Sequence, residues 1–217
     1  MNRLELIREL QQTGIFMMDN ELAWGTAGNI SARYNNDQFY VSASGTYLGE
    51  VAIDDFSLCS NTAILEGKKP SKEYIMHQGI YEERPEVNAI LHASPFYSTL
   101  VANSDIDIPS NYFVESMYYL EKIERIPYHH PGSRELAQAV KEKAKNANIM
   151  LLENHGIIVY DVSLKEARMA LQTLEYTAKM HITALKNEVN MQGLSKETVH
   201  DFLHNSGYKP VRNWPKR

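Results

Sequence analysis

The sequence contains a single cysteine, Cys59, so it cannot form a disulfide bond within one chain. This excludes the disulfide-rich scaffolds of small secreted domains and favours a reducing compartment, which we expect to be the cytoplasm. No run of about 18 apolar residues is present, so the sequence predicts no membrane span. The first ten residues mix charges into their apolar positions, and we therefore expect no signal peptide there.

Positive charge is also in short supply, because 22 basic residues face 27 acidic ones and the formal net charge is −5. Without a sustained basic stripe, nucleic acid is not expected as the main partner, and any anion must be bound by local groups. Internal repeats, low-complexity tracts and linkers are absent as well. The 217 residues, 43% of them hydrophobic, are enough to bury a sizeable core, so we expect one domain that spans residues 1–217.

Two short apolar segments each run into a polar cluster that contains a histidine. Residues 89–92 end in His92, and Ser94 follows two positions later, on the same side if the chain is extended there. Residues 149–152 form a second strand candidate that runs into the sequence ENHG, which contains His155. Either histidine alone could be a hydrogen-bonded core residue. As a pair at the ends of buried strands, they could face one cavity.

Three loops are rich in glycine, hydroxyl and amide groups. They are residues 25–31 (GTAGNIS), residues 44–46 (SGT) and residues 70–73 (PSKE), where Ser71 is the expected N-cap of a helix. Glycine lets the backbone present its amides to an anion, and free amides at a helix start attract negative charge. Each loop could also be a plain turn, and Glu73 could simply be an acid favoured by the helix dipole.

The remaining pattern alternates between helical and extended segments, which predicts an α/β fold. Helices are expected over residues 3–19, 72–84, 96–103, 112–120, 133–146, 163–187 and 195–204, and strands over residues 30–34, 38–42, 89–92, 149–152 and 157–160, with two more between 56 and 66 and a short one near 126.

Taken together, the glycine-rich loops and the two histidine segments resemble the class II aldolase/adducin family, and within it most closely the L-fuculose-phosphate aldolase type. The segments GTAGNIS, SG, PSKE, HAS and ENHG occur in the order and spacing of that family, over nearly the full chain. The resemblance implies a single three-layer α/β/α domain and a ring-shaped homotetramer with active sites between subunits. It also implies a divalent metal of the zinc type and a phosphorylated sugar as substrate.

The resemblance further implies roles for individual residues. His92 and His155 match metal-binding histidines, and Glu73 matches the acid/base carboxylate. The matches to the phosphate-binding loops are Thr26, Asn29, Ser44, Gly45 and Ser71. Lys72 stands where the family often has serine, and could strengthen phosphate binding or suit a differently placed anion. These residue types suit the chemistry, because imidazole binds zinc, zinc polarises a substrate oxygen and a carboxylate can move the proton.

The sequence departs from the family pattern at three places. Ser94 replaces the second histidine of the usual His-x-His, which should weaken zinc binding and leave manganese or iron as alternatives. Tyr112, beside Phe113, and Tyr208 match catalytic tyrosines, or are ordinary interface aromatics. Glu115 aligns, across a one-residue gap, with the catalytic glutamate of methylthioribulose-phosphate dehydratases of the same family, or lies on a solvated helix face.

These features lead to one main hypothesis about function and two alternatives. The main hypothesis is a metal-dependent lyase that cleaves a phosphorylated ketose to dihydroxyacetone phosphate and an aldehyde through a metal-stabilised enediolate. One alternative is a dehydratase or decarboxylase of a similar sugar phosphate, with Glu115 as the base. The other is a non-catalytic assembly module like adducin, suggested by Ser94. The presence of Glu73, His92 and His155 together with the phosphate loops favours an enzyme.

Overall fold

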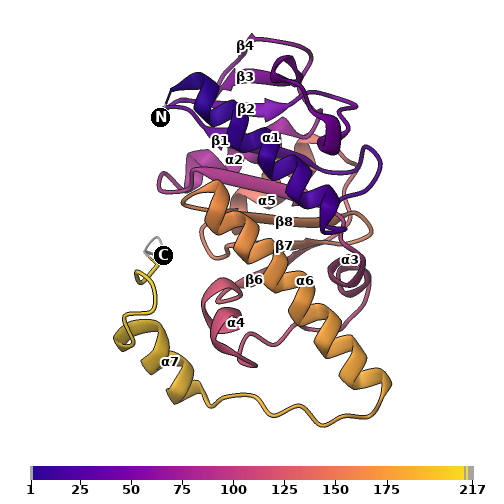
Figure 1. Ribbon diagram of the computed structural model, residues 1–217, viewed down its shortest axis with the longest axis vertical. Coiled ribbons are helices and arrows are strands. Elements are labelled where there is room, and N and C mark those ends of the chain that lie inside the picture. Colours follow the sequence, from indigo (N-terminus) through magenta and orange to yellow (C-terminus); the bar gives the residue numbers. More distant parts are fainter. Residues whose placement is uncertain (1, 213, 215–217) are drawn as a thin grey trace.

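The computed structural model of the protein describes residues 2–212 and residue 214. Its centre is one mixed sheet in the order β4-β3-β2-β1-β5-β8-β7-β6 (Figure 1). The strands are β1 (Asn29–Arg33), β2 (Gln38–Ser42), β3 (Phe56–Ser60), β4 (Ile64–Glu66), β5 (Ala89–Ala93), β6 (Ile123–Ile126), β7 (Ile149–Leu152) and β8 (Gly156–Asp161). Among these strands β6 and β7 pair in parallel, and all other neighbours pair antiparallel.

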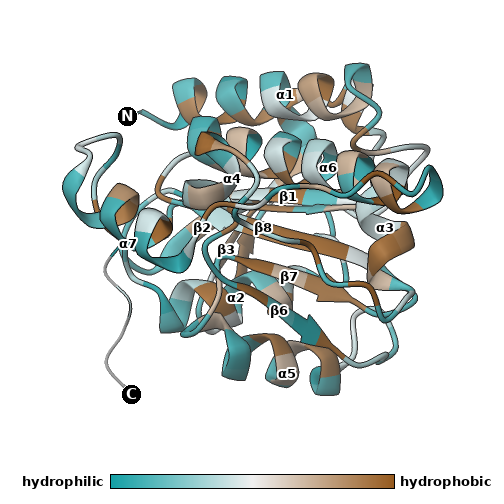
Figure 2. Ribbon diagram, turned by 90° about the horizontal axis from the view of Figure 1, so that it is seen from below, coloured by the Kyte–Doolittle hydropathy of each residue, from teal (hydrophilic) through white to brown (hydrophobic). Residues whose placement is uncertain are grey.

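Helices cover both faces of the sheet, which confirms the predicted three-layer α/β/α domain (Figure 2). One layer contains α1 (Arg3–Asp19), α3 (Phe96–Ala102), α4 (Val114–Tyr119) and α6 (Leu164–Lys186); the other contains α2 (Tyr74–Glu83) and α5 (Arg134–Ala144). Two short 3-10 helices, Leu48–Glu50 and Ile53–Asp55, precede β3, and α7 (Lys196–Asn205) lies near the end of the chain. No helix in the described ranges combines the length and the apolar character that crossing a bilayer requires.

Buried residues of β5 alternate between the two layers. Leu91 belongs to the hydrophobic core under α1 and α6, whereas Ile90 belongs to the core under α2 and α5. Because both faces are covered, the strand is a continuous apolar run rather than an alternating one. His92 follows the alternation of Ile90 and therefore faces the layer of α2 and α5.

Three helices begin at a serine that caps them. Ser133, Ser163 and Ser195 each accept a hydrogen bond from a backbone N–H of the helix that follows. Ser71 does not cap α2, so this prediction is wrong: the helix begins at Tyr74, two residues later than expected. The reason is an extra turn, in which the Tyr74 N–H donates to the Ser71 carbonyl and the Glu73 N–H donates to Ser71 Oγ at 3.3 Å.

The helix predicted over residues 112–120 is shorter in the structure, because α4 begins at Val114. The backbone of Phe113 is extended, and its N–H donates to Ser116 Oγ at 3.0 Å, which ends the helix on that side. Tyr112 therefore lies in the loop before α4, where its hydroxyl hydrogen-bonds His181 Nδ1 at 2.8 Å.

The middle of the sheet joins three strands that are distant in sequence. β5 lies between β1 and β8, with Asn29 opposite His92 and His92 opposite Ile158. Residues directly opposite each other on neighbouring strands point to the same face and touch. The register therefore places the end of the GTAGNIS loop beside the first predicted metal-binding histidine.

Candidate active site

The polar loops and both histidines line one cavity of about 280 Å³. It is lined by all six predicted phosphate-binding residues and by the predicted acid/base and metal ligands: Thr26, Asn29, Ser44, Gly45, Ser71, Lys72, Glu73, His92 and His155. Thr46 of the SGT loop and Ser94 also line it, together with Trp24 and Pro131, which the sequence analysis did not single out. The segments therefore converge as the sequence predicted.

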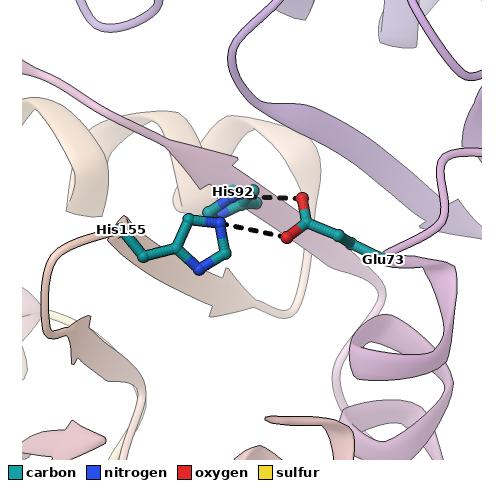
Figure 3. Close-up of side chains that lie close together, drawn as sticks. All are labelled: Glu73, His92 and His155. Atoms are coloured by element: carbon teal, nitrogen blue, oxygen red, sulfur yellow. Dashed lines mark ion pairs between the residues drawn. The ribbon is translucent and has the colours of Figure 1, made fainter. Parts of the chain in front are cut away.

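Glu73, His92 and His155 point toward one another from three different elements (Figure 3). His92 Nε2 lies 3.4 Å from Glu73 Oε2, and His155 Nε2 lies 3.0 Å from Glu73 Oε1. The two imidazole rings meet edge to face with their centroids 4.8 Å apart. Each residue offers one ligand atom, and these atoms all lie within 4.8 Å of one another.

His92 is held from behind by the sheet. Its Nδ1 lies 2.9 Å from the carbonyl oxygen of Ile157, which can only accept a hydrogen bond. The proton of a neutral His92 therefore sits on Nδ1, and the lone pair of Nε2 faces the cavity. Such a contact fixes both the tautomer and the ring orientation of a metal-binding histidine.

His155 is placed by the three-residue turn between β7 and β8. Leu152 and Gly156 pair across the turn, and Asn154 within it has a φ of 53°, a conformation that asparagine tolerates better than most residues. Gly156 allows close approach of the next strand, because a Cβ there would lie 2.5 Å from the carbonyl oxygen of Ala93. The tight turn brings His155 over the end of β5.

Glu73 is buried, and its two carboxylate oxygens differ in their partners. Oε2 accepts a hydrogen bond from Asn29 Nδ2 at 2.9 Å. Oε1 lies near His155 but accepts no hydrogen bond from any described group, although it is shielded from solvent. A buried acceptor without a donor is costly unless a cation or another partner satisfies it.

The pKa values of the cluster favour the charge states that bind metals. Burial raises the pKa of Glu73, but the contacts with His155, His92 and Asn29 outweigh burial and hold this pKa at about 2. Burial lowers the pKa of His92, against the opposing charge of Glu73. At neutral pH the carboxylate is therefore ionised and the His92 imidazole is neutral, as metal coordination requires.

The donor set fits a divalent cation. Two imidazole nitrogens and one carboxylate oxygen match the two-histidine, one-glutamate sets of catalytic zinc sites. Ser94 does not take the place of the missing imidazole directly, because its hydroxyl donates to the His155 carbonyl at 3.3 Å. These three residues could hold a metal, with positions left for water or substrate.

Two of the anion loops are joined by backbone hydrogen bonds. Ala43 and Pro70 form an isolated β-bridge, the Ser44 N–H donates to the Lys69 carbonyl, and the Ser71 N–H donates to the Ser42 carbonyl. This short ladder sets the Ser44-Gly45 loop beside Ser71 and Lys72. It also occupies the backbone amides of Ser44 and Ser71, so these two amides are not free to donate to an anion.

The GTAGNIS loop needs a glycine at position 28. Gly28 has a φ of 93°, and a Cβ at this residue would lie 2.7 Å from the carbonyl oxygen of His92. Only glycine allows both this conformation and this approach. The loop can therefore cross directly over the end of β5 and bring Thr26 and Asn29 to the cavity.

Three predicted catalytic residues do not line the cavity of their own chain. Glu115 is exposed on α4, and Tyr112 contacts His181 of α6. Tyr208 lies beyond α7, where its ring packs against Phe202 and Tyr118. Their predicted chemical roles stay predictions.

Sequence analysis missed His77, which lies beneath Glu73 and is fully buried. Its Nε2 lies 2.6 Å from Asn29 Oδ1 and its Nδ1 lies 2.7 Å from Ser31 Oγ. The sequence contained a signal for His77, because it lies four residues after Glu73 and four before Tyr81. Positions at intervals of four share one face of a helix.

Comparison with known proteins is consistent with this architecture. The chain matches the model of the class II aldolase and adducin N-terminal domain over residues 8–182. The 3-oxo-tetronate 4-phosphate decarboxylase of Haemophilus influenzae is 33% identical over 164 residues, which cover 73% of this chain and 78% of that protein. The L-fuculose phosphate aldolase of Escherichia coli is 30% identical over 199 residues, which cover 92% of this chain and 93% of that protein.

Solved structures give the same family. The structure of YgbL from Klebsiella pneumoniae has a TM-score of 0.83 at 27% identity and covers 93% of this chain and 99% of its own. The structure of an L-fuculose 1-phosphate aldolase has a TM-score of 0.81 at 25% identity and covers 91% of this chain and 94% of its own. The chain therefore belongs to the class II aldolase and adducin family and is an enzyme of its lyase class.

Proposed function

We propose that the protein is a metal-dependent aldolase that cleaves a phosphorylated ketose into dihydroxyacetone phosphate and an aldehyde. One observation carries this proposal: the buried cluster of Glu73, His92 and His155 shares a cavity with loops rich in hydroxyl groups and with Lys72. The similarity to the L-fuculose phosphate aldolase of Escherichia coli, which extends over 92% of the chain, supports the same reaction class.

The metal of this proposal is zinc, held by His92, His155 and Glu73. When bound, it would act as a Lewis acid that polarises a substrate oxygen. Since Ser94 supplies no third imidazole, zinc should be weakly held and exchangeable, and manganese or iron could replace it in a site with nitrogen and oxygen donors. Ser94 would reach the metal through a water molecule.

Glu73 is the proposed group that moves the proton at the ketose carbon. In cleavage, the hydroxyl on the carbon that becomes the aldehyde would lose its proton to the Glu73 carboxylate, which later returns it, and the carbon–carbon bond breaks with its electron pair left on the ketose fragment. That fragment then takes up a proton and becomes dihydroxyacetone phosphate. Glu73 suits this transfer because it lines the cavity and its Oε1 has no hydrogen-bond donor among the described groups.

The phosphate group of the substrate would lie at the other end of the cavity. We assign to that end five residues that line the cavity, Thr26, Ser44, Gly45, Ser71 and Lys72, with Lys72 as the cation. Asn29 is less available than predicted, because both ends of its carboxamide already hydrogen-bond Glu73 and His77. Crystals grown in high phosphate should hold an anion against Lys72, and a cavity filled only by water would weigh against a phosphorylated substrate.

A homotetramer with shared active sites completes the proposal. Tyr112 and Tyr208 do not line the cavity of their own chain, so a catalytic role for either tyrosine requires delivery by a neighbouring subunit. A closed tetramer would sediment at about 100 kDa, four times 24.8 kDa. A monomer at micromolar concentration would contradict this assembly.

Decarboxylation of a 3-oxo acid phosphate is the second candidate. It is favoured by the 33% identity to a 3-oxo-tetronate 4-phosphate decarboxylase. The machinery would be the same, because loss of carbon dioxide also leaves an electron pair on the carbon beside a carbonyl group. A dehydratase with Glu115 as its base has less support, since that carboxylate is exposed and does not line the cavity of its own chain.

The decisive test is an assay of protein loaded with zinc or manganese against phosphorylated ketoses and 3-oxo acid phosphates. We expect dihydroxyacetone phosphate from a ketose 1-phosphate, detected by a coupled reductase, and formation about 10³-fold slower in a Glu73→Gln variant. Release of carbon dioxide without dihydroxyacetone phosphate would replace the aldolase by the decarboxylase. Metal-loaded protein that yields neither product would refute both.

A further inference from the structure

A chain of hydrogen bonds leads from Glu73 away from the cavity into the core. Glu73 Oε2 accepts from Asn29 Nδ2 at 2.9 Å, and Asn29 Oδ1 lies 2.6 Å from His77 Nε2. His77 Nδ1 then lies 2.7 Å from Ser31 Oγ, which lies 2.8 Å from the Tyr81 hydroxyl. All five side chains are buried, and His77 and Ser31 are completely inaccessible to solvent.

Secondary structure holds both sides of this chain. Asn29 and Ser31 are alternate residues of β1 and therefore point to the same face of the sheet. His77 and Tyr81 are four residues apart on α2, so both face the strand. Asn29 also lies opposite His92 in the sheet, so the hydrogen-bond series is adjacent to a second residue of the metal cluster.

The chemistry of the groups determines which partner donates in each hydrogen bond of this series. A carboxylate only accepts hydrogen bonds, so the amide nitrogen of Asn29 faces Glu73 and its oxygen faces His77. That oxygen also only accepts, so His77 carries its proton on Nε2 and accepts from Ser31 through Nδ1. Ser31 has then used its proton and must accept from Tyr81. Burial, which lowers the pKa of His77 to about 3, keeps the ring neutral as this arrangement requires.

We propose that His77 is a positioning residue for the acid/base step: by donating to Asn29 it locks the carboxamide with its nitrogen toward Glu73 Oε2, which leaves Oε1 as the oxygen that exchanges the proton with substrate. The role of Oε1 rests on the proposed function; the locked carboxamide rests on the hydrogen-bond chain alone.

Asn29 cannot lock itself, because the two ends of a carboxamide have nearly the same shape. If it turned over, its oxygen would face the carboxylate and its NH₂ group would face the N–H of His77. Both contacts would be repulsive, and neither group could turn to water in a dry core. Without the His77 donor, only the contact with Glu73 would oppose this rotation. Glu73 would then lose its fixed orientation relative to His155.

A spectroscopic experiment tests the lock without any substrate. Protein labelled with ¹⁵N-histidine would be studied in long-range ¹H–¹⁵N spectra, with His77 assigned by its loss in a His77→Gln variant. We expect the Nε2–H tautomer for His77 and the Nδ1–H tautomer for His92 in metal-free protein. The opposite tautomer at His77 would reverse the chain and overturn the proposal.

Kinetics then test positioning against a merely structural role. His77→Phe keeps the ring volume without the donor and should lower kcat about 100-fold, a part of what an acid/base group contributes, with KM within about twofold. His77→Gln, whose amide nitrogen can take the place of Nε2, should recover most of that loss. Tyr160→Phe is the matched control, because it removes a fully buried hydroxyl that bonds Ala144 and Ala147 on α5 and its loop, and should leave kcat unchanged.

The outcomes separate the two proposals. An unchanged kcat in folded His77→Phe, or equal losses in the Phe and Gln variants, would reject the positioning role. If His77→Phe does not fold, the Gln variant together with Ser31→Ala, which removes the donor to His77 Nδ1 and should lower kcat by about tenfold, decides the question. Wild-type protein that cleaves no substrate would refute the proposed function, while the His77 tautomer would still decide the lock.

Discussion

The two ends of the cavity are built in different ways. At the proposed metal end, Glu73 and His92 are 6% and 2% exposed and are hydrogen-bonded into the sheet. At the proposed phosphate end, Thr26, Ser44 and Lys72 are exposed on loops, although Ser71 is buried. Proton transfer and metal coordination require atoms fixed to within fractions of an ångström, whereas attraction between a lysine and a dianion falls slowly with distance. Rigid burial is therefore found where the chemistry is short-ranged.

The largest effect should follow from neutralising the buried end. Glu73→Gln keeps the shape of the side chain and removes the group that moves the proton, so kcat should fall about 10³-fold. Steady-state assays would measure this, with Glu153→Gln in the neighbouring turn as the control at normal activity. Full activity of Glu73→Gln would show that Glu73 does not move the proton and that the buried end does not depend on this carboxylate for its chemistry.

At the same end of the cavity, removing an imidazole should lower the affinity for zinc and adding one should raise it. His155→Ala removes one of two imidazoles and should weaken zinc at least about 100-fold, whereas Ser94→His adds one and should tighten zinc at least about tenfold. Calorimetry on metal-free wild type and both variants would measure the changes. If wild type binds no divalent ion at millimolar concentration and Ser94→His restores none, His92 and His155 have only a structural role and the metal-lyase assignment fails.

Acid should destabilise the buried end through His77. Burial lowers the pKa of His77 to about 3, below the usual value of 6.5, so between these values the unfolded chain binds a proton that the native protein excludes. The stabilisation is complete above pH 6.5 and is lost as the pH falls toward 3. From pH 7 to pH 5 the wild type should lose about 2 kcal/mol more unfolding free energy than His77→Gln.

Urea unfolding at both pH values, at one protein concentration, would measure this difference. Equal losses in wild type and His77→Gln would mean that the ring takes up a proton in the native state without penalty. The buried end would then be less rigid than its hydrogen bonds indicate.

The smallest effect should come from the exposed end. Lys72→Met removes the cation of the phosphate loops and should raise KM for a phosphorylated substrate about tenfold, with kcat within about twofold, because a charge exposed to solvent contributes little. Lys69→Met is the matched control, since Lys69 is exposed but does not line the cavity. A fall in kcat instead of a rise in KM would show that Lys72 acts on the chemistry and that the two ends are not separate.

The sequence was most informative where several residues form one motif. Glu73, His92 and His155 each belong to a short segment that resembles a motif of the family, so their convergence could be predicted from that resemblance before the structure was known. The link between Ser31 and His77 could not, because it depends on how α2 packs on β1 rather than on spacing. The cap at Ser71 was wrong for a similar reason: only the backbone shows the additional turn before α2.

Residues that a second copy would supply are a different case. Tyr112, Tyr208 and Glu115 were singled out by resemblance, and one chain leaves them outside the cavity. Burial pattern and periodicity describe the packing of a single chain. Neither predicts how two subunits are arranged relative to each other. Their roles therefore depend on the assembly prediction.

The position of β5 between β1 and β8 also determines when the protein can acquire its activity. His92 and the Ile157 carbonyl that orients it are 65 residues apart, and His155 belongs to the turn that opens β8. We expect this pairing to form late in folding, because it closes a loop between residues distant in sequence. A chain growing from its N-terminus can form the anion loops and display Glu73, yet it has no metal cluster until β8 has been synthesised and has paired with β5. Metal binding would therefore report a completed sheet, because an unfinished chain lacks the cluster that would hold the ion.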